Sequence, residues 1–495
     1  MKEFQLKFIS NKQIVRSLKI LSLLQNHSVI TMKELASVTN SSDRTILTDI
    51  HRIKDHFKDT ISLEPTPIGY TFEIQNLRDY NEKKRALLEE EPLFQIVESI
   101  FFSECQHINE WSEQLFTTIS TLNKLFKNIT PLLKDYGISL SHNPVDFVGD
   151  EIDIRHFFHD FYYESDVTPH TIFPSLDIQE TALTISRAAF FEEYSFISFT
   201  DFNYIIYITL TRILSGKSIE KVNKKALDLK NHLINHSNVC VLVHIKDLLL
   251  EYFNTEVNEI ELFYLFIQLN TRRSAVSFKT EKLFIDRFNL WPEIKELAHN
   301  YTHAIDTPER YLKDGYIFFE SFFISIKARY CLSPTLNQNL EDISMRVKMT
   351  FPLEFQKTYR FISSTLKEEY KLPDKQLEDI TANLVLYTDS LRNFHWSSSK
   401  NIAILLEGNR FVVENIRSNA QRYLGKHCSL FFPDVTQLST DYFQTYNIDF
   451  IVTNYNDYLI NLDYGLPIIL FDTTPSKKDW YKLFQKLIPN LTRLI

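Results

Sequence analysis

The sequence predicts a mainly α-helical protein with tandem N-terminal winged helix-turn-helix domains, a helical-bundle middle and a small C-terminal α/β domain. First, only 8 of its 495 residues are glycine, whereas about 7% is usual and a β-sandwich needs glycine in its tight turns. Second, a helix-turn-helix pattern occurs twice before residue 164. Third, the last hundred residues alternate short apolar runs with helical patterns, as a parallel α/β sheet requires.

The composition is that of an ordinary globular chain, with 44% apolar and 24% charged residues. Phosphate-binding loops need glycine, and neither glycine-rich nucleotide motif is present. We therefore expect no cofactor and no enzymatic activity. The four cysteines lie far apart, which favours a reducing compartment and predicts neither a zinc site nor a disulfide framework. Without a signal peptide or a run of ~20 apolar residues, the chain is expected to be cytoplasmic and to have no membrane contact.

The first helix-turn-helix pattern occupies the N-terminal 75 residues. Residues 11–26 carry apolar side chains at helical spacing, residues 31–39 begin with a capping-box sequence, and residues 43–58 form a third amphipathic helix. Two β-like pieces follow at residues 61–63 and 70–74. Three helices followed by a hairpin are the order of a winged helix-turn-helix domain.

One face of the third predicted helix suits contact with DNA. Residues 1–64 carry ten Lys and Arg against seven Asp and Glu, on a chain whose net charge is −9. Basic charge confined to one end of a chain is typical of phosphate contact. The candidate DNA-binding residues on this helix are Arg44, Thr45, Thr48, Arg52 and Lys54. The alternative is that this face is solvated surface only.

The same pattern returns at an offset of about 76 residues, with helices predicted at 93–105, 108–116 and 117–137. Each third helix is followed by Ile-Ser-Leu, at residues 61–63 and again at 138–140. Internal similarity of this kind favours two DNA-binding modules in tandem. The second copy contributes the candidate DNA-binding residues Ser120, Thr121, Lys124 and Lys127. Double-stranded DNA is therefore the expected partner.

The rest of the chain divides into a helical part and an α/β part. Between about residues 165 and 395, long helical patterns are rich in aromatic side chains, and segment 248–269 resembles segment 365–387. This loose repeat predicts two helical domains whose aromatic clusters form core. Ser397–Ser399 marks a linker to the last domain, whose strands are predicted at 401–408, 427–433, 449–454 and 466–471.

This order of parts resembles the Mga/AtxA-type virulence regulators of Gram-positive bacteria along essentially the whole chain. Segment 198–205, continuing to Arg212 and Gly216, is similar to the Leu-Thr-Asp-His pattern of the family's PTS regulation domains, and segment 371–377 is similar to the stretch before that domain's second histidine. The resemblance implies winged helix-turn-helix domains at 1–75 and 76–164, PTS regulation-like domains at 165–287 and 288–397, and an enzyme IIB-like domain at 398–495.

The family's PTS regulation domains are phosphorylated on histidine, and here the sequence departs from the pattern. The histidine slots hold Phe202, Phe266, Gly315 and Asn383. The remaining candidates for phosphorylation are the displaced histidines His232, His236, His244, His299 and His303. Two pairs of these are spaced i, i+4, but no third ligand is evident, so we expect no metal site. The first strand of the IIB-like domain ends without the acceptor cysteine, so the resemblance implies contact and not phosphotransfer there.

The sequence therefore predicts a DNA-binding transcriptional regulator, an activator of virulence or carbohydrate-metabolism genes. It would be a homodimer held by the C-terminal α/β domain and the helical repeats, and modulated through the PTS regulation-like domains. The alternative is a cytoplasmic scaffold that binds phosphotransferase-system proteins and no DNA. An enzyme is disfavoured because neither a Ser/His/Asp set nor a carboxylate pair occurs at a spacing typical of a catalytic site.

Overall fold

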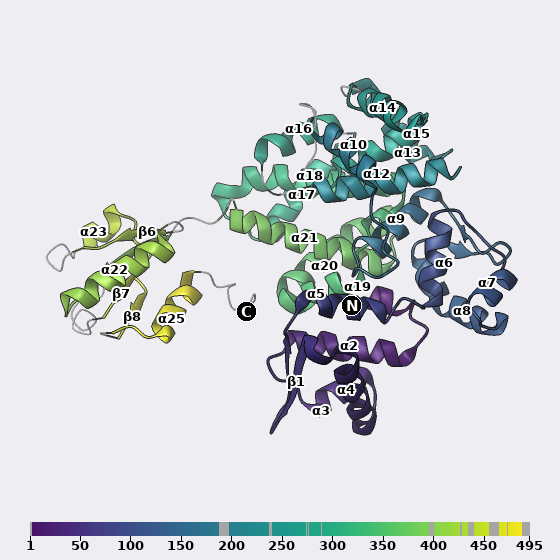
Figure 1. Ribbon diagram of the computed structural model, residues 1–495. Coiled ribbons are helices and arrows are strands. Elements are labelled where there is room, and N and C mark those ends of the chain that lie inside the picture. Colours follow the sequence, from purple (N-terminus) through teal and green to yellow (C-terminus); the bar gives the residue numbers. More distant parts are fainter. Residues whose placement is uncertain are drawn as a thin grey trace. The chain divides into compact units, whose positions relative to one another are not determined.

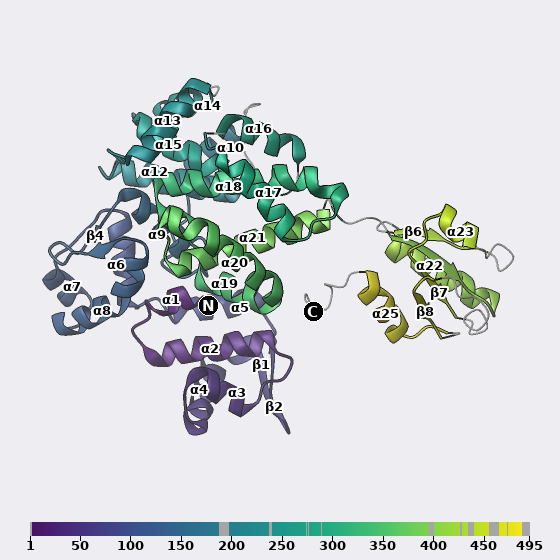
Figure 2. The ribbon, with the colours of Figure 1, turned by 180° about the vertical axis from the view of Figure 1, so that it is seen from behind.

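The computed structural model describes residues 2–187, 198–236, 240–273, 275, 277–288, 290–394, 396, 400–425, 428–433, 440–454, 465–472 and 474–487. The predicted linker Ser397–Ser399 lies outside these residues. Contacts divide the chain into two compact units, 1–390 and 391–495. No helix among the described residues is long and apolar enough to cross a membrane. The mainly helical fold class is confirmed (Figures 1 and 2), whereas the five domain boundaries stay predictions.

The first winged helix-turn-helix domain has the expected order of elements. Its elements are α2 (Lys12–Asn26), α3 (Met32–Thr39), α4 (Asp43–Phe57), β1 (Ile61–Thr66) and β2 (Gly69–Ile74). The antiparallel hairpin is longer than the sequence predicted, because Pro65 lies in β1 without interrupting its pairing with β2. A bridge between Ile30 and Tyr70 ties the hairpin to the start of α3. The apolar stripe of α4 is buried, as the spacing predicts.

The second copy repeats this order. Its elements are α6 (Pro92–Phe101), α7 (Ile108–Gln114), α8 (Ile119–Asp135), β3 (Ser139–Leu140) and β4 (Phe147–Val148). The helix predicted at 93–105 ends four residues early because Ser103 has a φ of 59°, a left-handed conformation that stops a helix. Between the two copies lies α5 (Leu77–Ala86), whose buried Tyr80 packs on Phe57 of the first copy. In Figures 1 and 2 the two copies form separate groups of helices.

A bundle of helices makes up the rest of the first unit. Its main helices are α9 (Glu151–Tyr162), α10 (Leu176–Arg187), α12 (Phe199–Leu214), α13 (Lys224–His236), α14 (Cys240–Phe253), α15 (Glu259–Asn270), α16 (Phe278–Phe288), α17 (Glu293–Ala304), α18 (Leu312–Leu332), α19 (Glu341–Thr350), α20 (Pro352–Tyr370) and α21 (Asp374–Phe394). The two segments of the loose repeat each contain a break, where Asn254 and Lys371 have φ of 48° and 49°. The aromatic clusters of α9 and α18 are buried, as expected of core.

The N-terminal residues before α2 form part of this core. The short helix α1 (Glu3–Leu6) carries Phe4, which lies 5.9 Å from the ring of Phe157, and Phe8 follows at 4.9 Å from the ring of Phe161. The side chain of Gln5 hydrogen-bonds the carbonyl oxygens of Phe161 and Asp166. The first residues of the chain are therefore fixed against α9.

A buried network of four charges joins α9 to two helices of the bundle. Arg155 donates two hydrogen bonds to Glu261, at 2.6 and 2.8 Å, and a third to Glu151 at 3.1 Å. Arg212 binds the same Glu151 at 2.8 and 2.9 Å. Burial opposes the charge on Arg155, but Glu261 raises the pKa of Arg155 above its ordinary value. Two cations and two carboxylates thus neutralise one another in a site where Arg155, Arg212 and Glu261 are buried and Glu151 is 12% exposed.

The same network reaches the second winged helix-turn-helix domain. Arg212 donates to the carbonyl oxygen of Ile100, at the end of α6, at 3.0 Å. Arg155 donates to the carbonyl oxygen of Lys217, and the ammonium of Lys217 binds Asp146 between β3 and β4 at 2.8 Å. The helical bundle is therefore attached to both the first helix and the wing of the second domain.

We predict that Glu261→Ala destabilises the 1–390 unit by about 3–5 kcal/mol, because it leaves Arg155 buried without its main partner. The measurement is the urea midpoint of unfolding, followed by circular dichroism. Glu82→Ala is the matched control, because Glu82 is 59% exposed and pairs with Arg78 on α5, an interaction of about 0.5 kcal/mol. Equal, small effects of the two substitutions would contradict the structural role of the network.

The second unit is a small α/β domain. Its elements are β5 (Lys400–Leu405), α22 (Arg410–Leu424), β6 (Cys428–Phe431), α23 (Thr440–Thr445), β7 (Phe450–Thr453), β8 (Ile468–Leu470) and α25 (Lys477–Leu487). The strands form one parallel sheet in the order β6-β5-β7-β8. The parallel sheet that the alternating pattern predicts is confirmed.

Candidate nucleic-acid interface

The turns before α4 and α8 have the same backbone geometry in both copies. Asn40 and Phe116 each have a φ of 48°. The amide that follows, of Ser41 or of Thr117, hydrogen-bonds a carbonyl oxygen of the preceding helix at 3.0 Å in both cases. The two copies therefore share the same turn conformation and the same hydrogen bond, so the sequence repeat is also a structural repeat.

The two candidate recognition helices, α4 and α8, also begin alike. Ser42 caps α4 by accepting a hydrogen bond from the amide of Thr45, and Thr118 caps α8 in the same way through Thr121. In both copies the two hydroxyl oxygens lie 2.9 Å apart. Thr48 donates its hydroxyl to the carbonyl oxygen of Arg44. The hydroxyls of all three candidate threonines therefore have partners within their own helices.

The cations of α4 point away from the core. Arg44 is exposed, the side chain of Arg52 is 52% exposed, and that of Lys54 is 37% exposed. Asp49, which is fully buried, accepts two hydrogen bonds from Arg16 of α2 and also lies 3.9 Å from the guanidinium of Arg52. The hydrogen bond to Asp49 raises the pKa of Arg16. This pair fixes α4 on α2 while the outer face stays accessible.

The second copy presents a similar face on α8. Ser120, Thr121, Lys124 and Lys127 are all exposed, and the core side of the helix is buried. Sequence reasoning missed Phe116, which is 99% exposed in the turn before this helix. The sequence feature that could have identified Phe116 is an aromatic residue at the position where the first copy has Asn40.

The candidate phosphorylation histidines lie on three different helices, α13, α14 and α17. His299 and His303 share one face of α17, as their spacing predicts, and both contact Tyr316 of α18: the ring of His299 stacks on it at 3.7 Å, and Nε2 of His303 lies 3.1 Å from its hydroxyl. His232 is half-buried on α13. His236 and His244 lie on α13 and α14, and their side chains are outside the described residues.

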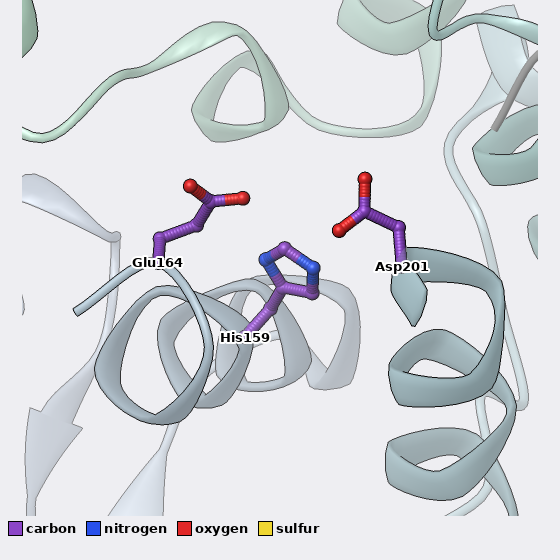
Figure 3. A group of neighbouring side chains, drawn as sticks. All are labelled: His159, Glu164 and Asp201. Atoms are coloured by element: carbon purple, nitrogen blue, oxygen red, sulfur yellow. The ribbon is translucent and has the colours of Figure 1, made fainter. Parts of the chain in front are cut away.

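Apart from the candidate histidines, three side chains have ligand atoms close enough together to bind a metal ion. His159 and Glu164 come from the end of α9 and the turn after it, and Asp201 comes from the first turn of α12 (Figure 3). Arg272 already lies 3.4 Å from a carboxylate oxygen of Asp201 and 3.5 Å from Nε2 of His159. A bound cation would have to lie next to this guanidinium, so the cluster is better explained as an ion-pair network.

The C-terminal sheet contains a cysteine, but on a different strand from the one expected of an enzyme IIB acceptor. Strand β5 ends at Leu405 and is followed by Glu407, which exchanges hydrogen bonds with Asn454 at 2.9 and 2.7 Å. Cys428 starts the edge strand β6, where burial raises the pKa of its thiol. A thiol in this state is a poor nucleophile at neutral pH.

Two helix-turn-helix domains with exposed polar helices define a class of DNA-binding transcriptional regulator. Residues 11–65 match the helix-turn-helix domain of the M protein trans-acting positive regulator, Mga, and residues 77–162 match the Mga helix-turn-helix domain. The chain is thus a DNA-binding transcriptional regulator whose two helix-turn-helix domains are similar to those of Mga.

Two regulators of Bacillus anthracis are similar to this chain. It is 22% identical to the capsule synthesis positive regulator AcpB, in an alignment that covers 95% of this chain and 97% of AcpB. It is 26% identical to the capsule synthesis positive regulator AcpA over 216 residues, which is 42% of this chain and 44% of AcpA. The alignment with AcpA therefore spans less than half of that relative.

We predict that Ser42→Ala and Thr118→Ala each destabilise the domain that contains them by about 1 kcal/mol, because each removes the acceptor for the first free amides of its helix. Amide hydrogen exchange in α4 and α8 of the whole protein measures the loss. Thr130→Ala is the control, since its hydroxyl donates to a carbonyl oxygen within α8 and caps nothing. Unchanged exchange at both helix starts would contradict these caps.

Proposed function

We propose that this regulator activates transcription as a homodimer that contacts double-stranded DNA through the exposed faces of α4 and α8. The observation that carries the proposal is the repetition of one turn, cap and exposed basic face in two copies. Similar chains named positive regulators of capsule synthesis support the activating sign.

The exposed residues of α4 and α8 would make different kinds of contact with DNA. Arg44 and Arg52 carry planar guanidinium groups, which suit bidentate contact with guanine in the major groove. Lys54, Lys124 and Lys127 would bind phosphates, which position a protein on DNA without reading its sequence. The hydroxyls of Thr45, Thr48 and Thr121 are already bonded within their helices, so their methyl groups are what they would offer to bases.

We propose that the helical bundle receives the regulatory signal, through phosphotransferase-system proteins or phosphorylation of a displaced histidine. His299 is the best placed of the candidates with described side chains. Burial and the nearby Lys295 lower the pKa of His299, so the ring is neutral at pH 7 and keeps a nucleophilic nitrogen. A phosphoryl group there would add negative charge between α17 and α18.

The C-terminal unit has an apolar surface that suits self-association. A groove of about 300 Å³ is lined by residues of α22 and of the segment from Thr474 to Trp480, and Phe411 at its edge is 85% exposed. An exposed aromatic side chain beside an apolar groove on a small domain supports the homodimer proposal.

We predict that the whole protein binds duplex DNA with a log K that falls steeply as log salt rises, and that Arg44→Ala and Lys124→Ala each weaken binding about tenfold. Lys124→Ala should also lower the salt slope by about one, because it removes one cation from the phosphate contact, whereas Arg44→Ala removes a base contact and should relax the sequence preference. Fluorescence anisotropy across a salt series measures both quantities.

Lys486→Ala, on the exposed surface of α25 in the other unit and outside the proposed dimer groove, is the control for a general charge effect. If the dimeric protein binds no duplex even at low salt, DNA contact by these domains is wrong. The alternative function, a scaffold that binds phosphotransferase-system proteins, would then be the favoured one.

We predict that Phe411→Asp shifts the protein toward monomer, because a carboxylate would have to be buried in the apolar contact. Sedimentation velocity measures the change, and Lys486→Asp, at an exposed position of α25 outside the groove, is the matched control. A dimer that persists in the Phe411 variant would exclude this surface as the interface.

A further inference from the structure

The side chain of Phe116 has no structural reason for its position. It is 99% exposed, so almost none of its apolar surface is removed from water. It occupies the turn between α7 and α8 with a φ of 48°, a left-handed conformation that bulky residues rarely adopt. Both features are unfavourable for the folded state, and folding alone would favour a different residue.

The first copy of the domain shows which residue folding favours. At the equivalent turn Asn40 has the same φ of 48° and the same hydrogen bonds follow it. Asparagine tolerates the left-handed region because its short polar side chain bonds locally. The backbone therefore does not require phenylalanine at this turn, and the difference between the copies lies in what the side chain contacts.

The surroundings of Phe116 identify that contact. Two residues later Thr118 caps α8, and the exposed polar residues of this helix begin at Ser120. Ile119, in the first turn of α8, is a second apolar side chain at this end and is 41% exposed. An apolar group at the N-terminus of a recognition helix lies where the edges of bases are reached in the major groove. There, the apolar feature of a base pair is the C5-methyl group of thymine.

We infer that Phe116 is a specificity residue that contacts a thymine methyl group at the edge of the major groove. The inference rests on the proposed function, since it requires α8 to lie on DNA. The contact would give the second domain a preference for thymine that the first domain, with Asn40 at the same turn, lacks.

The test is a double-mutant cycle between protein and DNA. A 40-base-pair duplex is selected from a randomised pool by the wild-type protein and then prepared with deoxyuridine in place of thymidine, which removes only methyl groups and keeps all base-pair hydrogen bonds. Affinities of the wild type and of Phe116→Asn are measured for both duplexes. Asparagine suits the turn, so this variant should fold at least as well as the wild type. Phe173→Asn, at a side chain 55% exposed outside the two domains, is the matched control.

We expect uridine to weaken wild-type binding about tenfold and to leave the affinity of Phe116→Asn nearly unchanged, with the control behaving as wild type. Equal effects of uridine on the wild type and on Phe116→Asn would overturn the inference. So would a Phe116→Asn protein that binds the thymidine duplex as tightly as the wild type but fails to activate transcription, because Phe116 would then contact a protein. A wild type that selects no duplex would overturn the proposed function itself.

Discussion

The contact between Arg155 and Glu261 is the interaction on which the arrangement of the first unit depends. Both side chains are almost fully buried, and neither charge could stay there without the other. Glu261 also accepts a hydrogen bond from the amide of Ile219, and Arg155 binds Glu151 and the carbonyl oxygen of Lys217. Because these side chains share partners, the network links α9, α12 and α15 to one another.

This constraint also connects the helical bundle to the second DNA-binding domain. Through Arg212 the network reaches the end of α6, and through Lys217 it reaches the wing. A signal that moved α12 or α15 would change contacts on both sides of α8. The first domain has a different attachment, through α5 and the N-terminal residues that pack on α9. The two copies are thus alike in their turns and caps but are held to the bundle by different means.

Local patterns were sufficient for most of the fold and for the positions of the candidate recognition helices, α4 and α8. The stripe of α4, the capping box at Thr31 and the repeated Ile-Ser-Leu are short-range signals, so the sequence predicted these elements directly. The early end of α6 was missed, because no sequence rule marks Ser103 as left-handed. Phe116 was missed because packing decides its exposure, and the sequence shows only that an aromatic residue replaces Asn40 of the first copy. The candidate histidines were correctly placed on helices, but only packing brought Tyr316 against His299 and His303.

The sequence by itself determined the class of fold, the tandem DNA-binding domains and the parallel C-terminal sheet, because each depends on hydrophobic periodicity and turn residues over a few tens of positions. Tertiary structure alone decided which charges are buried together and which side chains of the candidate interface are accessible. Arg155 and Glu261 are 106 residues apart, and no local sequence pattern in either segment predicts that they pair. Pairing over such a distance depends on how whole helices pack. The physical reason is that a buried charge needs a partner, and helix packing determines which residue of opposite charge lies beside it.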